Sequence, residues 1–263
     1  MTKQPHHEAT IQRTIDHFQA QPEVLALLLG GSIAHGWAQP TSDVDILIIV
    51  SDEEHQRRSA KNDARFYSPE LATYPDGYVD GKYISPMFLT QVEERGSEPA
   101  RFAFADAQVL FSHLADLAER LPRIARYPVE DKDNRIKRFQ AQFQAWYWFA
   151  SEAEQKQNRY LLNLAVNKLQ LFGGRMVLAH NELLYPFHKW FPAMLERAPD
   201  KPEKLLEVMR TLSEAPTHAN ATVFYNLIND FRTWETDDLF WADRFLHDSE
   251  LTWMEGTTPI DDV

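Results

Sequence analysis

A Gly-Gly-Ser turn and an Asp-x-Asp pair stand close together in this sequence, and their residue types suit a phosphate and a metal ion. Residues 27–50 read LLLGGSIAHGWAQPTSDVDILIIV. Glycines let the backbone turn sharply and approach a ligand closely, and a serine where a helix begins offers its hydroxyl and nearby amides to an anion. Gly31 and Ser32 are therefore expected to hold a phosphate.

Asp43 and Asp45 open the second apolar run of this segment. Because side chains alternate faces along a strand, the two carboxylates should project together while Val44 points the opposite way. Alternate strand positions are about 6.6 Å apart, and like charges at that spacing repel by about 2 to 3 kcal/mol at an effective dielectric of about 20. A divalent cation offsets this repulsion, and Mg²⁺ is usually held by one or two carboxylates with substrate phosphates and water. We therefore expect Asp43 and Asp45 to bind Mg²⁺.

The elements that position these residues form an alternating pattern in the first half of the chain. Helical patterns cover residues 10–20 and 52–65, and strand patterns cover residues 24–29, 46–50, 77–85 and 107–111. The turn and the acid pair thus lie between two buried strands. Strands interleaved with helices predict a catalytic domain over residues 1–125, built as a mixed sheet with flanking helices.

The second half of the chain loses the strand pattern and is predicted to be helical. Helical patterns cover residues 132–156, 160–182, 187–196, 202–213 and 217–233. The fold class is therefore α+β, with residues 126–263 forming an all-helical bundle domain. Its large aromatic residues are expected to pack in the core, among them Trp146, Trp148, Phe172 and Trp190.

Composition limits the range of functions. The chain has 263 residues, a formal net charge of −12 and no cysteine, so a metal must bind to carboxylates, histidines or backbone oxygens. The negative charge disfavours nucleic acid as a partner, because nucleic-acid binding draws on Lys and Arg. No apolar stretch is long enough to span a membrane and the first residues lack the apolar core of a signal peptide, so we expect a cytoplasmic location.

These residues resemble the nucleotidyltransferase superfamily, which includes DNA polymerase beta and the antibiotic adenylyltransferases. Its signature is a hydrophobic residue, Gly, and Gly or Ser, a spacer of roughly ten residues, and then two acids around a hydrophobic residue. Here Leu29 precedes the Gly-Gly-Ser turn, residues 33–42 form the spacer, and Asp43-Val44-Asp45 completes the pattern. The signature covers less than a tenth of the chain, but the combination is specific.

The resemblance also implies a third carboxylate on a later strand, acting as a metal ligand, as the base that activates the acceptor hydroxyl, or as both. Asp80 in the segment GYVDGKYIS is the candidate, since it lies on the next convincing strand and shares a face with Tyr78 and Lys82. The alternative is a turn aspartate that precedes Gly81. The fallback candidates for the third acid are Asp76, Glu70 and Asp106.

The acidic motif itself contains no cation for a triphosphate, so the helical half is expected to supply one. Antibiotic adenylyltransferases resemble this layout, with a helical bundle that contributes a lysine to the triphosphate and closes over substrate and nucleotide. Lys189 is the first candidate and Lys168 the second, while a solvated surface lysine is the alternative for each. Lys168 and Arg175 are seven residues apart and should share a helix face.

The resemblance implies an enzyme that transfers a nucleotide, AMP from ATP by preference, to a hydroxyl of a small molecule such as an aminoglycoside or lincosamide antibiotic. Pyrophosphate would be released and Mg²⁺ would be the cofactor. Two alternatives stay open. The acceptor could be a protein or RNA, as in toxin or regulatory members, or the chain could bind nucleotide without turnover. Neither the acceptor nor the oligomeric state follows from the sequence.

Overall fold

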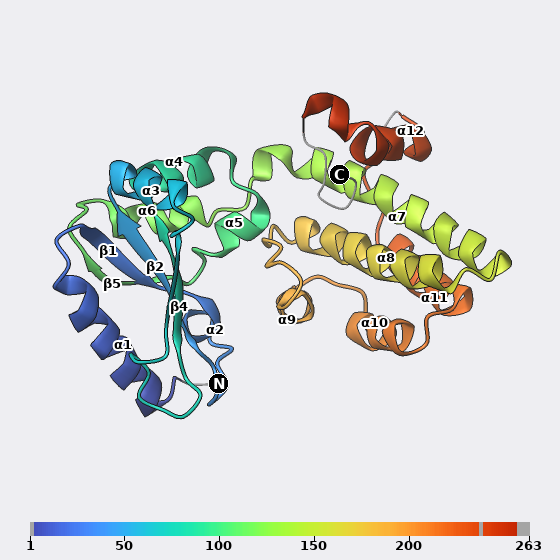
Figure 1. Ribbon diagram of the computed structural model, residues 1–263. Coiled ribbons are helices and arrows are strands. Elements are labelled where there is room, and N and C mark those ends of the chain that lie inside the picture. Colours follow the sequence, from blue (N-terminus) through green and yellow to red (C-terminus); the bar gives the residue numbers. More distant parts are fainter. Residues whose placement is uncertain (1–2, 237–238, 257–263) are drawn as a thin grey trace. The chain divides into compact units, whose positions relative to one another are not determined.

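The computed structural model describes residues 3–236 and 239–256. The chain divides into two compact units, Met1–Arg126 and Tyr127–Val263. The first contains a five-stranded sheet with helices and the second is helical (Figure 1). The predicted fold class, a mixed-sheet region followed by a helical region, is therefore confirmed. No helix among the described residues combines the length and apolar character needed to cross a lipid bilayer.

The N-terminal unit is built on a mixed sheet in the order β3-β4-β2-β1-β5. The strands are β1 (Val24–Leu29), β2 (Val44–Val50), β3 (Arg65–Ser68), β4 (Val79–Ile84) and β5 (Gln108–Ser112). The helices are α1 (Pro5–Gln19), α2 (Gly31–Ala34), α3 (Asp52–Ala60), α4 (Pro86–Arg95), α5 (Glu98–Phe102) and α6 (Leu117–Ile124). Strands β2 and β4 run parallel, and the other neighbouring pairs are antiparallel.

Both faces of the sheet are buried, which explains the nearly continuous apolar runs of β1 and β2. Helix α1 packs Ile11 and Phe18 against the face that carries Val44 and Ile46. Helices α4 and α6 cover the opposite face, where Leu47 and its neighbours lie. Burial along the two parallel strands is interrupted at Asp45 in β2 and at residues 80–82 in β4.

The prediction for residues 52–65 was wrong at its end. The helix α3 stops at Ala60, and β3 begins at Arg65. Asn62 adopts a left-handed backbone conformation, with φ of 56°, which ends the helix. Strand β3 lies at the edge of the sheet and has no buried residue. Phe66 and Tyr67 favour a strand, but four residues are too few to form a clear apolar run.

The helical unit is dominated by two long helices that pack on each other, α7 (Lys132–Gln155) and α8 (Arg159–His180). The remaining elements are α9 (Phe191–Arg197), α10 (Leu205–Glu214), α11 (His218–Asn229), α12 (Trp241–Phe245), and the short helices η1 (Val129–Asp131), η2 (Leu246–Glu250) and η3 (Thr252–Glu255). A Cβ atom at Gly173 of α8 would lie 2.8 Å from the ring of Phe143 and 2.9 Å from the ring of Phe224. Glycine at this position therefore permits close packing of α7, α8 and α11.

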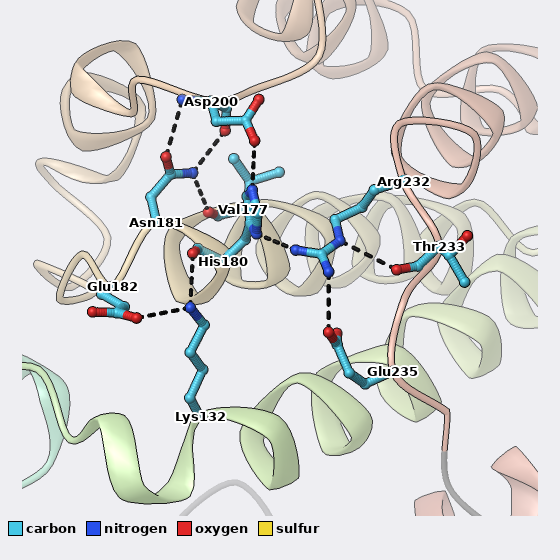
Figure 2. Close-up of polar contacts among 9 residues, drawn as sticks. All are labelled: Lys132, Val177, His180, Asn181, Glu182, Asp200, Arg232, Thr233 and Glu235. Atoms are coloured by element: carbon cyan, nitrogen blue, oxygen red, sulfur yellow. Dashed lines mark hydrogen bonds and ion pairs between the residues drawn. The ribbon is translucent and has the colours of Figure 1, made fainter.

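Polar side chains tie the carboxyl end of α8 to three other segments, as Figure 2 shows. Lys132 of α7 donates to the carbonyl of His180 at 3.0 Å and to the carboxylate of Glu182 at 2.9 Å. His180 also contacts Asp200 at 2.6 Å and Arg232. Cations beside the last carbonyls of a helix are favourable, because those carbonyls carry partial negative charge. The network fixes the end of α8 within its unit.

Candidate active site

The Gly-Gly-Ser turn passes directly over one of the two acids. Gly31 has a φ of 60°, and a Cβ atom placed on it would lie 1.7 Å from Oδ2 of Asp45. The amide of Gly30 donates to the carbonyl of Asp45 at 2.9 Å. Only glycine fits at position 31, because any side chain would both strain the backbone and displace the carboxylate.

Ser32 follows in the one-turn helix α2 and is only 4% exposed. Its Oγ atom is buried and has no hydrogen-bond partner among the described residues. An unsatisfied buried hydroxyl costs free energy, so such groups in a native protein call for an explanation. A ligand that accepts or donates a hydrogen bond at Ser32 would remove this cost.

The acids are gathered by the parallel pairing of β2 and β4, in which Asp45 lies opposite Asp80. Val44 is in the core of the α1 face, so the acids project to the other face, as the alternation of β2 requires. The pKa of Tyr78 shows that the acids lie close together. The negative charge of Asp43 raises the pKa of the Tyr78 phenol, burial and a hydrogen bond to Asp43 add to this, and the charges of Asp80 and Asp45 raise it further.

The loop before Asp43 is held at several points. The hydroxyl of Tyr74 donates to the carbonyl of Ser42, and the amide of Gln39 donates to the hydroxyl of Ser42 at 2.8 Å. At the other end of the loop, the ring of His6 in α1 contacts the carbonyl of Pro40 at 2.8 Å. These contacts fix the backbone that enters β2 and so position Asp43.

Asp80 differs from the other two acids in its contacts. Its Oδ1 atom accepts a hydrogen bond from the amide of Gly81 at 2.9 Å and lies 3.3 Å from Nε of Arg65 in β3. The side chain is partly exposed, and Arg65 is largely exposed. A solvent-accessible ion pair of this kind is weak, so Asp80 can exchange Arg65 for a substrate group.

Sequence reasoning missed a cation in this site. Lys82 lies two residues after Asp80 on β4, and therefore on the same face of the sheet. Its side chain is exposed, yet the protein around the ammonium partly desolvates it and lowers its pKa, while the negative charge of Asp45 opposes that shift. The two-residue spacing was visible in the sequence. The proximity to Asp45 depends on the pairing of β2 with β4, which the sequence does not reveal.

The fallback acids have other surroundings. Asp106 contacts the buried ring of His35 at 3.2 Å, Glu70 accepts from the hydroxyl of Ser68 at 3.0 Å, and Asp76 lies in a turn with a φ of 58°.

The two lysines predicted in the helical unit have different surroundings. Lys189 is exposed and lies over the ring of Trp190, with 4.9 Å between Nζ and the ring centroid. Lys168 lines a cavity together with Arg175, as their shared helix face predicted.

The donor set fits a hard divalent cation held by two carboxylates. Among the described residues no group of three or more His, Asp or Glu side chains is arranged to hold a metal ion. Mg²⁺ does not require such a cage, since one or two carboxylates suffice when phosphate oxygens and water complete its coordination. Asp43 and Asp45 would be the protein ligands, and Asp45 lies beside the turn at Gly31.

Part of the N-terminal unit matches a known protein family. Residues 11–96 match the protein-family model for the nucleotidyltransferase domain. The crystal structure of a nucleotidyltransferase-like protein from Exiguobacterium sibiricum 255-15 is similar over 94% of this chain and 78% of that chain, with 12% sequence identity and a TM-score of 0.48. No curated protein sequence matches the chain. The matched residues include the turn, both acids and all of β4, so the N-terminal unit contains a nucleotidyltransferase domain.

Proposed function

Because its N-terminal unit contains a nucleotidyltransferase domain, we propose that this protein is a Mg²⁺-dependent adenylyltransferase. It would move AMP from ATP to a hydroxyl of a small molecule, such as an aminoglycoside-type antibiotic, and release pyrophosphate. The observation that carries the proposal is the buried, unpartnered hydroxyl of Ser32 in a glycine turn that touches Asp45. A phosphate held there would lie beside the carboxylates that suit its metal ion.

Each residue has a distinct role in the proposed reaction. Gly31 and Ser32 bind the outer phosphates, and Asp43 and Asp45 hold the divalent cation. When bound, that cation would stabilise charge on the attacking and leaving oxygens. Asp80 accepts the proton of the acceptor hydroxyl as its oxygen bonds to the α-phosphorus and the bond to pyrophosphate breaks. Phosphoryl chemistry mainly requires such positioning and charge stabilisation.

The leaving pyrophosphate also requires positive charge. We propose Lys82 for this role, since it lies on the same face of the sheet as the acids and near Asp45. Lys189 remains the first candidate from the helical unit and Lys168 the second. Lys189 is exposed, and its ammonium is available to a ligand on the side that faces away from Trp190.

The proposal is tested by incubating the protein with Mg²⁺, α-labelled ATP and a panel of hydroxyl-bearing antibiotics. Pyrophosphate release with label on a small molecule is the expected result. Label on protein or RNA would support the alternative acceptors, of which RNA is disfavoured by the charge of −12. Tight ATP binding without pyrophosphate release, with any acceptor, would contradict an enzymatic function and support a nucleotide-binding module.

Asp80→Asn distinguishes a base from a metal ligand. If Asp80 is the base, turnover should fall by on the order of a hundredfold or more, while the affinity for Mg²⁺-ATP stays the same. If that affinity also falls, Asp80 binds the metal. Unchanged turnover would remove Asp80 from the site. Glu53→Gln, an exposed acid of α3, is the matched control and should retain both properties.

A further inference from the structure

A large cavity lies within the helical unit and has no part in the site described above. Its volume is about 1210 Å³, and all the residues that line it belong to the unit Tyr127–Val263. Residues of α7 and α8 form one side, and residues 245–253 form the other. The cavity is a feature of this unit alone, so the inference drawn from it does not depend on the proposed function.

Aromatic side chains form much of the cavity wall. Phe139 and Trp146 of α7 and Phe172 of α8 face it, where the sequence predicted that Trp146 and Phe172 would be core residues. Tyr160 and Trp253 also line it, and they are 78% and 61% exposed. Phe139 and Phe172 pack together with 6.3 Å between their ring centroids, so the wall is a joined aromatic surface. Such a surface suits a planar, apolar ligand body.

Basic side chains outnumber acidic ones in the wall. Arg135, Arg138, Lys168 and Arg175 line the cavity, against Asp131, Asp248 and Glu250. Two of the arginines are neutralised, because Arg135 pairs with Asp131 at 3.0 Å and Arg138 pairs with Asp248 at 2.9 Å. Lys168 is a further cation of the wall, and the remaining acid, Glu250, is exposed.

Arg175 and Lys168 have different surroundings in this wall. The guanidinium of Arg175 lies 4.3 Å from the ring centroid of Phe139 and 4.5 Å from that of Tyr185, so it is held between two aromatic faces. Lys168 is half-buried, and no described residue forms a hydrogen bond or ion pair with its ammonium. A half-buried ammonium in a cavity is stabilised when an anion binds to it.

We infer that this cavity is a binding site for a small organic anion with a planar ring body. The rings of the wall would enclose the apolar body, and the ammonium of Lys168 would bind the negative group. A polycation such as an aminoglycoside is not suited to this wall. If Lys168 binds an anion in this cavity, Lys82 and Lys189 are the candidates that bind the triphosphate of the proposed reaction.

The experiment uses two probes that share a ring system and differ in charge, 2-naphthoate and 2-naphthylmethylammonium, with binding to the full-length protein measured by calorimetry. The anion should bind at least about tenfold more tightly than the cation. Lys168→Met should weaken 2-naphthoate binding by about tenfold or more, and Lys168→Arg should restore most of it. Lys156→Met, which removes a 70% exposed cation from the end of α7, is the matched control and should change nothing.

Three results would overturn the inference: no binding of 2-naphthoate, equal or tighter binding of the cation, or full binding by a folded Lys168→Met variant. Asp45→Asn should bind 2-naphthoate normally, which separates this site from the proposed reaction. Competition with AMP in the absence of metal then identifies the source of the ligand. If AMP displaces 2-naphthoate, the natural occupant is a nucleotide. If AMP does not displace it, the natural occupant is another aromatic anion.

Discussion

Gly31 shows at the scale of one residue how tightly the site is built. Its φ of 60° favours glycine, and its missing side chain leaves the space that the Asp45 carboxylate occupies. Gly36 has a φ of 74° but nothing within 4 Å of the position of a Cβ atom. The two glycines therefore share the backbone requirement, and only Gly31 adds a close approach to an acid. Substituting each glycine in turn therefore distinguishes the effect of backbone strain from the effect of moving Asp45.

Gly31→Ala should lower the free energy of unfolding by more than Gly36→Ala, which should cost about 1 to 2 kcal/mol through its left-handed backbone. Gly31→Ala should also abolish the Mg²⁺-dependent binding of ATP, because Asp45 must move, while Gly36→Ala should retain it. Urea unfolding and nucleotide titration measure the two properties. If the two variants had the same affinity for Mg²⁺-ATP, the turn would not position Asp45.

At the scale of elements, the parallel pairing of β2 with β4 assembles the site. Asp45 faces Asp80 across the pair, and Lys82 follows on the same face. The strand patterns of β1, β2 and β4 predicted these elements because their apolar runs are local. The pairing partner of each strand is a long-range property, so the charge of Lys82 beside Asp45 could not be predicted. Edge strand β3 is only four residues long, so its local pattern was too short to predict a strand.

Lys82→Met tests what this pairing contributes. We expect the rate of transfer to fall by on the order of a hundredfold, which is the usual cost of removing one group that stabilises developing charge. The free energy of unfolding should stay the same or rise, since the protein no longer desolvates an ammonium. Steady-state kinetics and urea unfolding measure both effects. Lys61→Met removes an exposed lysine and is the control, and equal activity of the two variants would exclude Lys82 from the site.

At the scale of the whole molecule, we expect the free energy of unfolding to depend on pH through a buried histidine of the N-terminal unit. His7 of α1 is 0% exposed, and it accepts a hydrogen bond from the amide of Gln4 at 3.3 Å. Burial lowers the pKa of His7 from its ordinary value of about 6.5, and the neighbouring His6 lowers it further. The unfolded chain therefore takes up this proton at a higher pH than the folded protein does.

The free energy of unfolding should consequently fall as the pH drops below about 6.5, until the pH passes the lowered pKa of folded His7. His7→Gln keeps a polar side chain that can cap the first turn of α1 and does not titrate. Its stability should fall less between pH 7.5 and pH 5.5 than that of the natural protein, as measured by urea unfolding. Parallel losses in the two proteins would show that another group titrates.

The sequence predicted the layout of the molecule better than its internal spaces. The predicted change from strand to helical patterns after residue 125 is a matter of periodicity, which is local. The cavity of the helical unit was hidden, because Trp146 and Phe172 have the spacing of core residues. Periodicity marks the apolar side of a helix, but it does not tell whether other side chains fill the space beside it.

The binding of ATP by the N-terminal site tests the proposed function most directly, because it requires no knowledge of the acceptor. Calorimetry with the α,β-methylene analogue of ATP, which cannot be cleaved at the reacting bond, should give tighter binding with Mg²⁺ than without it. Asp43→Asn and Asp45→Asn should each lose most of this difference, and Glu53→Gln should keep it. If Mg²⁺ strengthened binding equally in all four proteins, Asp43 and Asp45 would not hold the metal and the proposed reaction would be wrong.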